Sequence, residues 1–192
     1  MVYLVLGLLL FIGVHSIRIF SDTSRTQWVL GFGEGRYKFA FSLVSALGLG
    51  LIVWGFGQAR ENPLMLWIPP QGMRHLAALL TWVAFLFIAA AYVPGNYIKA
   101  RLHHPMVLGV KAWALAHLLA TGSVAHLVLF GCFLLWATAS FRAARRRDRI
   151  TNPKVAGAAL IPTLGCVAMG TLLWAVFAFF LHGLLIGIRP FG

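Results

Sequence analysis

Two histidines, His15 and His117, lie inside apolar segments of the chain, in the stretches GLLLFIGVHSIRIF and MVLGVKAWALAHLLATG. No Asp or Glu lies in any long apolar stretch. An ionisable side chain at membrane depth costs about 2.5 to 3.5 kcal/mol on insertion scales, so its presence indicates a partner such as a metal, a proton path or a ligand. We therefore expect imidazole chemistry here and no proton relay built from carboxylates.

Small residues surround His117 on its expected helix. Ala114 and Ala120 lie one turn away on the same face, and Gly109 lies two turns back. This spacing would let a flat cofactor approach the backbone. Trp113 would then stack on the cofactor or line its cavity.

The surroundings of His15 suggest a carboxylate partner. Arg18 lies one turn along the same face, where a guanidinium can hold a carboxylate at the membrane boundary. Haem b has an apolar macrocycle, two propionates and an iron that accepts axial imidazoles, so it matches both histidines. Spacing alone leaves open that they are satisfied core side chains. The predicted propionate partners, which could equally contact lipid headgroups, are Arg18, Arg36, Lys99, Arg101 and His104.

The remaining histidines and the cysteines carry weaker signals. His75, His103 and His104 lie at expected span ends, and His126 and His182 lie in spans without a further motif. Membrane di-iron oxygenases need many histidines at short spacings, and only the 103–104 pair is present. Cys132 and Cys166 form no CxxC pair, so zinc or thiol redox chemistry is not expected.

The composition is that of an integral membrane protein. Hydrophobic residues make up 60% of the chain, charged residues 10%, and the mean hydropathy is +0.86. One soluble domain of 192 residues cannot bury that much apolar surface. We expect an all-α, polytopic membrane helical bundle that forms a single domain over residues 1–192, with no sequence repeat.

Apolar runs predict about six transmembrane helices. They cover residues of about 2–20, 38–57, 76–94, 105–122, 123–141 and 155–187. The fourth and fifth runs are separated only at Gly122 and Ser123. The glycines at 31, 33 and 35 are expected in a loop, whereas Gly48 with Gly50, and Gly183 with Gly187, favour close helix packing.

The net charge of +12 is best explained by anchoring in the membrane. The run of Arg145, Arg146, Arg147 and Arg149 directly follows the apolar segment that ends near Phe141, where a cytoplasmic anchor belongs. With the N-terminus outside, all basic clusters face the cytoplasm only if the fourth and fifth spans are separate. The partner is therefore a lipid bilayer, expected to be a bacterial inner membrane, and not nucleic acid. The oligomeric state is left open.

Several stretches of the chain resemble the NnrU family of bacterial membrane proteins. They are HSIR at 15–18, GEGRYKFAFSLVSALGL around Arg36, HPMVLG at 104–109 and WALAHLLATG at 113–122. The same pattern is similar to plant ζ-carotene isomerase, and the resemblance covers most of the chain from His15 to about Phe141. It implies a small all-helical membrane bundle. In the isomerase branch it implies a haem b whose iron is bound by the residues matching His15 and His117.

The chain departs from the isomerase pattern at Ala114. The plant sequences have a cysteine inside the corresponding tryptophan-to-histidine motif, so a change of iron ligand to that sulfur is not open to this chain. Two functions remain. One is a haem-dependent cis–trans isomerase of a hydrophobic polyene such as ζ-carotene. The other is a non-catalytic haem sensor, electron-transfer or assembly factor in nitrogen-oxide respiration (denitrification).

Overall fold

The computed structural model describes residues 1–152 and 157–191, and this part of the chain is helical without strands. It divides into two compact units. The first unit comprises residues 1–67 and 122–143, and the second comprises residues 68–121 and 144–192. The expected all-α fold is confirmed.

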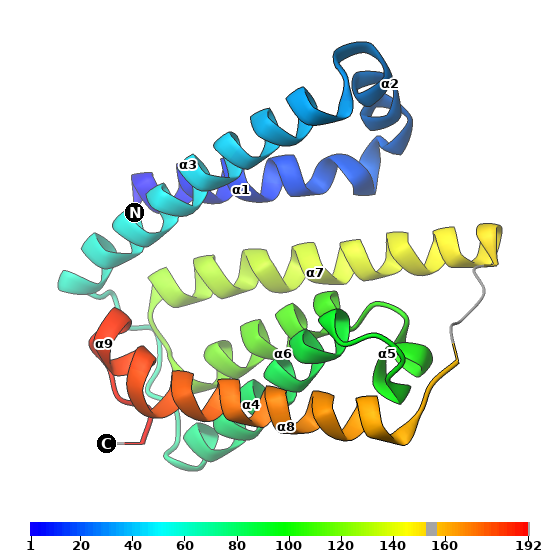
Figure 1. Ribbon diagram of the computed structural model, residues 1–192. Helices are drawn as coiled ribbons and strands as arrows, with labels where there is room; N and C mark the ends of the chain where they lie inside the picture. The colour runs from blue at the N-terminus through cyan, green and yellow to red at the C-terminus, as the bar shows by residue number, and fades with distance from the viewer. Residues whose placement is uncertain (153–156, 192) are drawn as a thin grey trace. The chain divides into compact units, whose positions relative to one another are not determined.

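Figure 1 shows the helices in chain order. They are α1 (Val2–Phe20), α2 (Asp22–Phe32), α3 (Glu34–Glu61), α4 (Gly72–Tyr92), α5 (Tyr97–Leu102), α6 (Pro105–Ala120), α7 (Val124–Thr151), α8 (Leu160–Val176), a π-helical turn (Phe177–Leu181) and α9 (His182–Ile186). Five helical segments are long and apolar enough to cross a membrane: α1, α3, α4, α7 and the continuous stretch Leu160–Ile186. The fourth expected span corresponds to α6, which has 16 residues and is about 24 Å long at 1.5 Å per residue.

The predicted break between the fourth and fifth spans is confirmed. Helix α6 ends before Gly122, and the chain pairs there with the segment that follows α3. An isolated bridge joins Met65 to Ser123, and the Leu66 N–H donates to the Gly122 carbonyl at 2.8 Å. A side chain at Gly122 would collide with the backbone carbonyl of Trp67, so only glycine fits this turn.

The expected loop at residues 31–35 is wrong. The segment is almost entirely helical, and only Gly33 stands between α2 and α3. Its φ of +84° is a conformation that favours glycine, so one residue is enough to separate the two helices. Gly31 and Gly35 are helical, and a Cβ at either would meet open space.

The expected helix packing at Gly183 and Gly187 is also wrong. Gly187 ends α9 in a left-handed conformation with φ of +78°. The space beside Gly183 is occupied by the stem of Arg189, which lies just beyond the same helix end. The two glycines therefore shape the C-terminal turn and do not form a flat helix face.

Helices α1 and α3 of the first unit approach each other closely through glycines (Figure 1). A Cβ at Gly7 would lie 2.6 Å from the Ile52 nitrogen, and one at Gly48 would lie 2.8 Å from the Phe11 nitrogen. Gly55 faces the backbone of Leu4 in the same way. Gly48 thus packs as expected, whereas Gly50 faces open space.

In the second unit, α4 packs against both α6 and α8. Two indole N–H groups tie α4 to α8: Trp82 donates to Thr171 at 3.0 Å, and Trp174 donates to Thr81 at 3.1 Å. Such pairs satisfy polar atoms where no water is present. A short helix, α5, carries the chain from α4 to α6.

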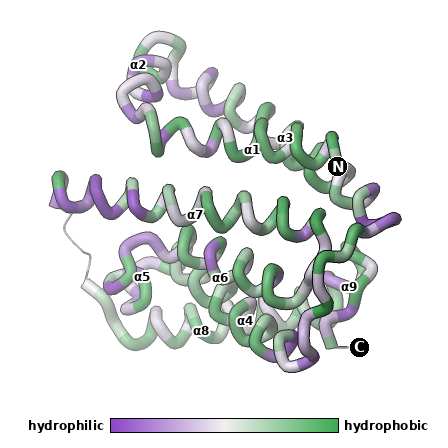
Figure 2. The backbone as a smooth tube through the Cα atoms, turned by 180° about the vertical axis from the view of Figure 1, so that it is seen from behind, coloured by the Kyte–Doolittle hydropathy of each residue, from purple (hydrophilic) through white to green (hydrophobic). Residues whose placement is uncertain are grey.

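The long helices consist largely of hydrophobic residues (Figure 2), and many of their large apolar side chains are exposed. Exposed side chains include Leu9, Leu47, Leu135, Ile161 and Leu172. Hydrophilic residues gather on α2, at α5 and at the C-terminal end of α7 (Figure 2). This distribution suits lipid around the helix middles, so the chain is a multi-pass membrane protein.

The glycine contacts between α1 and α3 give the first testable prediction. Gly55→Ala should lower the midpoint of thermal unfolding in detergent, because overpacking against backbone costs about 1 to 3 kcal/mol. The matched control is Gly50→Ala on the same helix, which adds a Cβ in open space. The control should leave the midpoint unchanged or raise it, since alanine favours helix over glycine. Equal midpoints for the two variants would contradict the packing.

Candidate functional site

His15 lies on α1 in the first unit, half-buried and enclosed by aromatic rings. Its Nδ1 lies 2.7 Å from the carbonyl oxygen of Phe11, one turn earlier. A carbonyl only accepts hydrogen bonds, so Nδ1 carries the proton and Nε2 carries the lone pair in the neutral ring. The imidazole stacks on Phe11 at 4.2 Å between ring centroids and meets Phe41 of α3 at 4.9 Å.

Trp136 of α7 belongs to the same cluster and was not predicted from the sequence. Its ring stands edge to face with His15, with centroids 6.0 Å apart and planes at 88°. Its buried Nε1 has no hydrogen-bond partner among the described residues. Leaving a buried donor unsatisfied costs about 1 to 3 kcal/mol, so the geometry favours an acceptor or π-system supplied by a bound molecule. The sequence has seven tryptophans, and nothing in its pattern distinguishes Trp136 as a neighbour of His15.

His117 lies on α6 in the second unit and makes the same backbone contact as His15. Its Nδ1 lies 2.8 Å from the carbonyl oxygen of Trp113, and the two rings are 5.3 Å apart. The hydroxyl of Thr121 in turn donates to the His117 carbonyl at 2.7 Å. The orientation of this imidazole is therefore set by its own helix, and its Nε2 is the nitrogen with the lone pair.

The small residues near His117 serve helix packing. Gly109 is buried against α4, where an added Cβ would lie 3.0 Å from the Ala84 carbonyl oxygen and 3.1 Å from the Ile88 side chain. Ala114 is fully buried as well. The expectation that a flat cofactor approaches the backbone at Gly109 is thus wrong, because α4 occupies that space.

Each of the two histidines, taken by itself, has the ring orientation of a metal-binding imidazole. A metal-binding imidazole donates its other N–H to a carbonyl or carboxylate, which fixes both the tautomer and the ring orientation. His15 and His117 both have this arrangement. The orphaned indole of Trp136 lies beside one of them. Within the described residues no group of three or more His, Cys, Asp or Glu could hold a bare metal ion, but haem iron requires only axial ligands from the protein.

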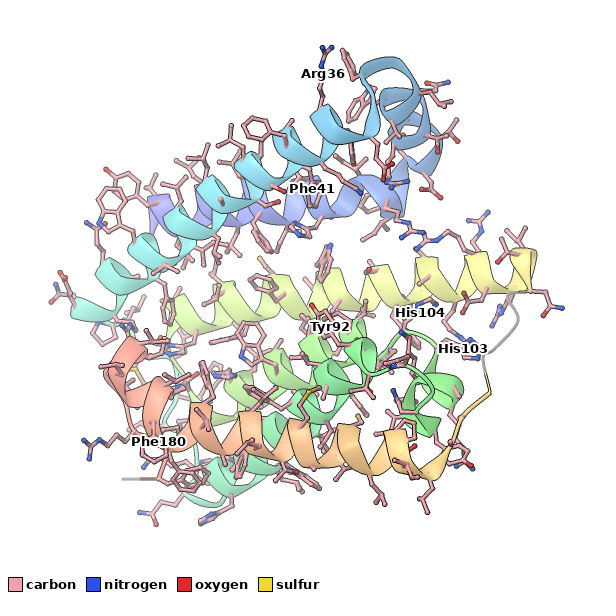
Figure 3. The ribbon with its side chains drawn as sticks, in the orientation of Figure 1. Arg36, Phe41, Tyr92, His103, His104 and Phe180 are labelled. Atoms are coloured by element: carbon pink, nitrogen blue, oxygen red, sulfur yellow. The ribbon has the colours of Figure 1, made fainter. Side chains whose placement is uncertain are left out.

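The predicted propionate partners lie in both units. In the first, the exposed Arg18 side chain lies 3.9 Å from Asp22, and Arg36 extends from the start of α3 (Figure 3). In the second, Lys99 donates to the Ala91 carbonyl at 2.9 Å, and Arg101 is exposed on α5.

His104, the remaining predicted partner, is engaged with a carboxylate (Figure 3). Its Nε2 lies 2.9 Å from Asp148 near the end of α7, and His103 and Arg145 approach the same oxygen at 3.8 and 3.7 Å. The side chain of Asp148 is only 17% exposed. Asp148 is the sole acidic residue in the sequence of the second unit. The basic side chains of this unit therefore have no other carboxylate within the unit to pair with.

A strained turn presents His103 and His104 to Asp148. His103 has φ of 63° and ψ of −47°, and the His104 N–H donates to the Leu102 carbonyl at 2.7 Å. These values describe a γ-turn of the rare, positive-φ type. Such strain persists only where surrounding contacts hold it, and the shared carboxylate of Asp148 is such a contact.

An apolar cavity of about 410 Å³ lies in the first unit beside the His15 cluster. Residues of α1, α2 and α3 line it, and it is open on one side, since Trp28 and Phe32 are exposed. Its lining includes Phe41, the ring that contacts His15. The other lining residues are Val14, Ile17, Trp28, Phe32, Arg36, Tyr37, Ala40 and Val44. No pattern in the sequence predicts this cavity, because it is formed by contacts between three separate helices.

The contact between His104 and Asp148 gives the second prediction. Asp148→Asn should lower the thermal unfolding midpoint in detergent by several degrees, since a hydrogen bond to a charged group contributes about 1.5 to 3 kcal/mol. Asp22→Asn is the matched control, because its pair with Arg18 is exposed and long. A midpoint that falls equally in both variants would show that Asp148 has no special role.

Comparison with known proteins places the chain in a family. The family model described as NnrU protein matches residues 3–190, which is nearly the whole sequence. No curated protein and no solved structure matches the chain. The match extends beyond the motifs around His15, His104 and His117 to all of the membrane helices described above. The chain therefore belongs to the NnrU family.

Proposed function

We propose that this NnrU-family membrane protein binds haem b and that His15 and His117 are its axial iron ligands. The observation that carries the proposal is a hydrogen-bonding pattern that the two imidazoles have in common. In each, Nδ1–H donates to the carbonyl four residues earlier and Nε2 retains its lone pair. Haem b would supply a redox-active iron in an apolar setting.

The residues around each histidine have distinct roles in this proposal. Phe11 stacks on the His15 ring and Phe41 contacts it at a tilt, so both restrict its movement. Trp113 and Thr121 fix the backbone and ring of His117. Arg18, one turn from His15, is the propionate partner that we favour in the first unit, because its pair with Asp22 is exposed and readily exchanged.

The position of the basic residues supports a bacterial inner membrane with the arginine-rich end of α7 in the cytoplasm. Family membership supports a function linked to nitrogen oxides. A haem protein of this kind could sense a gas, pass electrons or support assembly of a respiratory partner. We propose this non-catalytic function as the alternative to catalysis.

A second candidate, a haem-dependent isomerase of a hydrophobic polyene, is favoured by the cavity beside Phe41. An enzyme of that kind needs an apolar space next to the iron ligand, and the cavity adjoins a ring in contact with His15. Ala114 provides no thiolate to replace His117. Opening a coordination position would thus require one imidazole to leave.

The third prediction tests haem ligation. His15→Ala and His117→Ala should each abolish the low-spin, bis-imidazole spectrum of the purified protein, because each removes one axial ligand. His75→Ala is the matched control, since His75 is an exposed histidine of α4. An unchanged low-spin spectrum in either ligand variant would refute that assignment. The haem-to-protein ratio of the wild type, expected to be one, would show whether both residues serve one iron.

The fourth prediction separates the enzyme from the binding module. The resting protein should be six-coordinate and should bind carbon monoxide or nitric oxide only after reduction or loss of one histidine. Reduced protein is then incubated with a poly-cis carotenoid, and the products are separated by chromatography. Product that depends on both His15 and His117 supports the isomerase. Gas binding without product supports the sensor or assembly function, and a five-coordinate resting iron contradicts the ligation scheme.

A further inference from the structure

The cavity of the first unit has a volume and an apolar lining suited to a single apolar chain. Helices α1, α2 and α3 all contribute to it, and its volume of about 410 Å³ lies within the usual range of small-molecule sites. Aromatic rings from α2 and α3 form much of its lining, including Trp28, Phe32 and Tyr37. Tyr37 stacks on Phe41 at 6.3 Å, which continues the aromatic lining inward.

The basic side chains around this cavity differ in whether they contact an acidic or aromatic partner. Lys38 pairs with Glu34 at 2.7 Å, and Arg18 lies 3.9 Å from Asp22. The guanidinium of Arg25 lies over the Tyr37 ring at 5.8 Å.

Arg36 is different from these three cations. It lines the cavity, it is exposed, and it has no ion pair, hydrogen bond or ring contact with any described residue. Its side chain extends outward from the start of α3 (Figure 3). Long basic side chains commonly lay their stem along an apolar surface and place the charge at its rim. The cavity thus combines an apolar interior with one uncompensated cation.

We propose that this cavity binds a single-chain amphiphile with a carboxylate head, the chain lying among the aromatic rings and the carboxylate pairing with Arg36. A guanidinium binds a carboxylate through two parallel hydrogen bonds, which gives both affinity and orientation. Burial of the chain supplies the remaining affinity. In this proposal Arg36 pairs with the carboxylate of the amphiphile and not with a haem propionate, and binding does not require the haem. Its inner end reaches Phe41, so a bound chain would lie one aromatic ring away from His15.

The test uses parinaric acid, a fluorescent conjugated-polyene fatty acid, with the full-length protein in phosphatidylcholine nanodiscs. Energy transfer from the tryptophans to the probe is recorded. The decrease in transfer in the Trp28→Phe variant measures the probe bound in the cavity, since Trp28 lines it. Empty discs give the background, and the Soret absorbance is recorded to keep haem loading equal. We expect saturable transfer that oleate abolishes at a concentration about tenfold lower than methyl oleate requires, since only the acid pairs with Arg36.

Three variants examine the assigned contacts. Arg36→Gln should weaken binding of the acid about tenfold and leave the methyl ester unaffected, since it removes one charge-assisted contact. Ala40→Trp should block both ligands by filling the cavity, while its Soret spectrum stays that of the wild type. Lys38→Gln is the matched control, because it removes a neighbouring charge that already pairs with Glu34 and does not line the cavity.

Other results would overturn the inference in distinct ways. Equal competition by oleate and methyl oleate would show that no acidic head is recognised. Competition by phosphatidylglycerol in place of oleate would assign the cavity to a membrane phospholipid. Displacement of the probe by added haem would make the cavity part of the haem site. Loss of haem in the His15 and His117 variants with normal probe binding would leave this inference intact, so the two proposals fail independently.

Discussion

The absence of water from hydrocarbon governs this structure, because a polar hydrogen in a membrane span has no water to bond and needs an acceptor from the protein or from a bound molecule. The helices satisfy their backbone groups, and several side chains use the same carbonyls. His15 donates to Phe11 and His117 donates to Trp113, each across four residues. Ser45 and Thr121 bond in the same way to carbonyls one turn earlier. The need to place a side-chain proton thus also sets the ring orientation of the two candidate ligands.

The packing of the helices meets the same constraint by different means in each unit. In the first unit, glycines at 7, 48 and 55 bring α1 and α3 into backbone contact, so few side chains separate them. In the second unit, α4 joins α8 through paired indoles and threonine hydroxyls. Within the hydrocarbon, association depends on close packing and internal hydrogen bonds, since lipid tails are as apolar as the helices. These contacts involve several of the small and polar residues of the spans.

Charge is concentrated at helix ends and is strongly unbalanced. The chain has only four acidic residues against sixteen Lys and Arg, and three of these acids contact a basic group within four residues or across helices. The excess cations can only be balanced by anions from outside the chain. Lipid headgroups are one source, and haem propionates and a fatty carboxylate are others. Arg36 is notable among these cations because its stem lines an apolar cavity.

The sequence by itself determined the class, the helix order and the two histidines. Long apolar runs cannot be anything other than membrane helices at this composition, and basic clusters placed the break at Gly122 and Ser123 where the structure has it. Tertiary structure decided which neighbours those residues meet. Three examples are contacts between helices that are distant in the sequence. Gly109 packs on α4, His104 is hydrogen-bonded to Asp148, and the ring of Trp136 contacts that of His15. Periodicity within one helix carries no information about them. The same holds for the cavity, since it exists only because Gly33 adopts a positive φ and lets α2 form a helix beside α1 and α3.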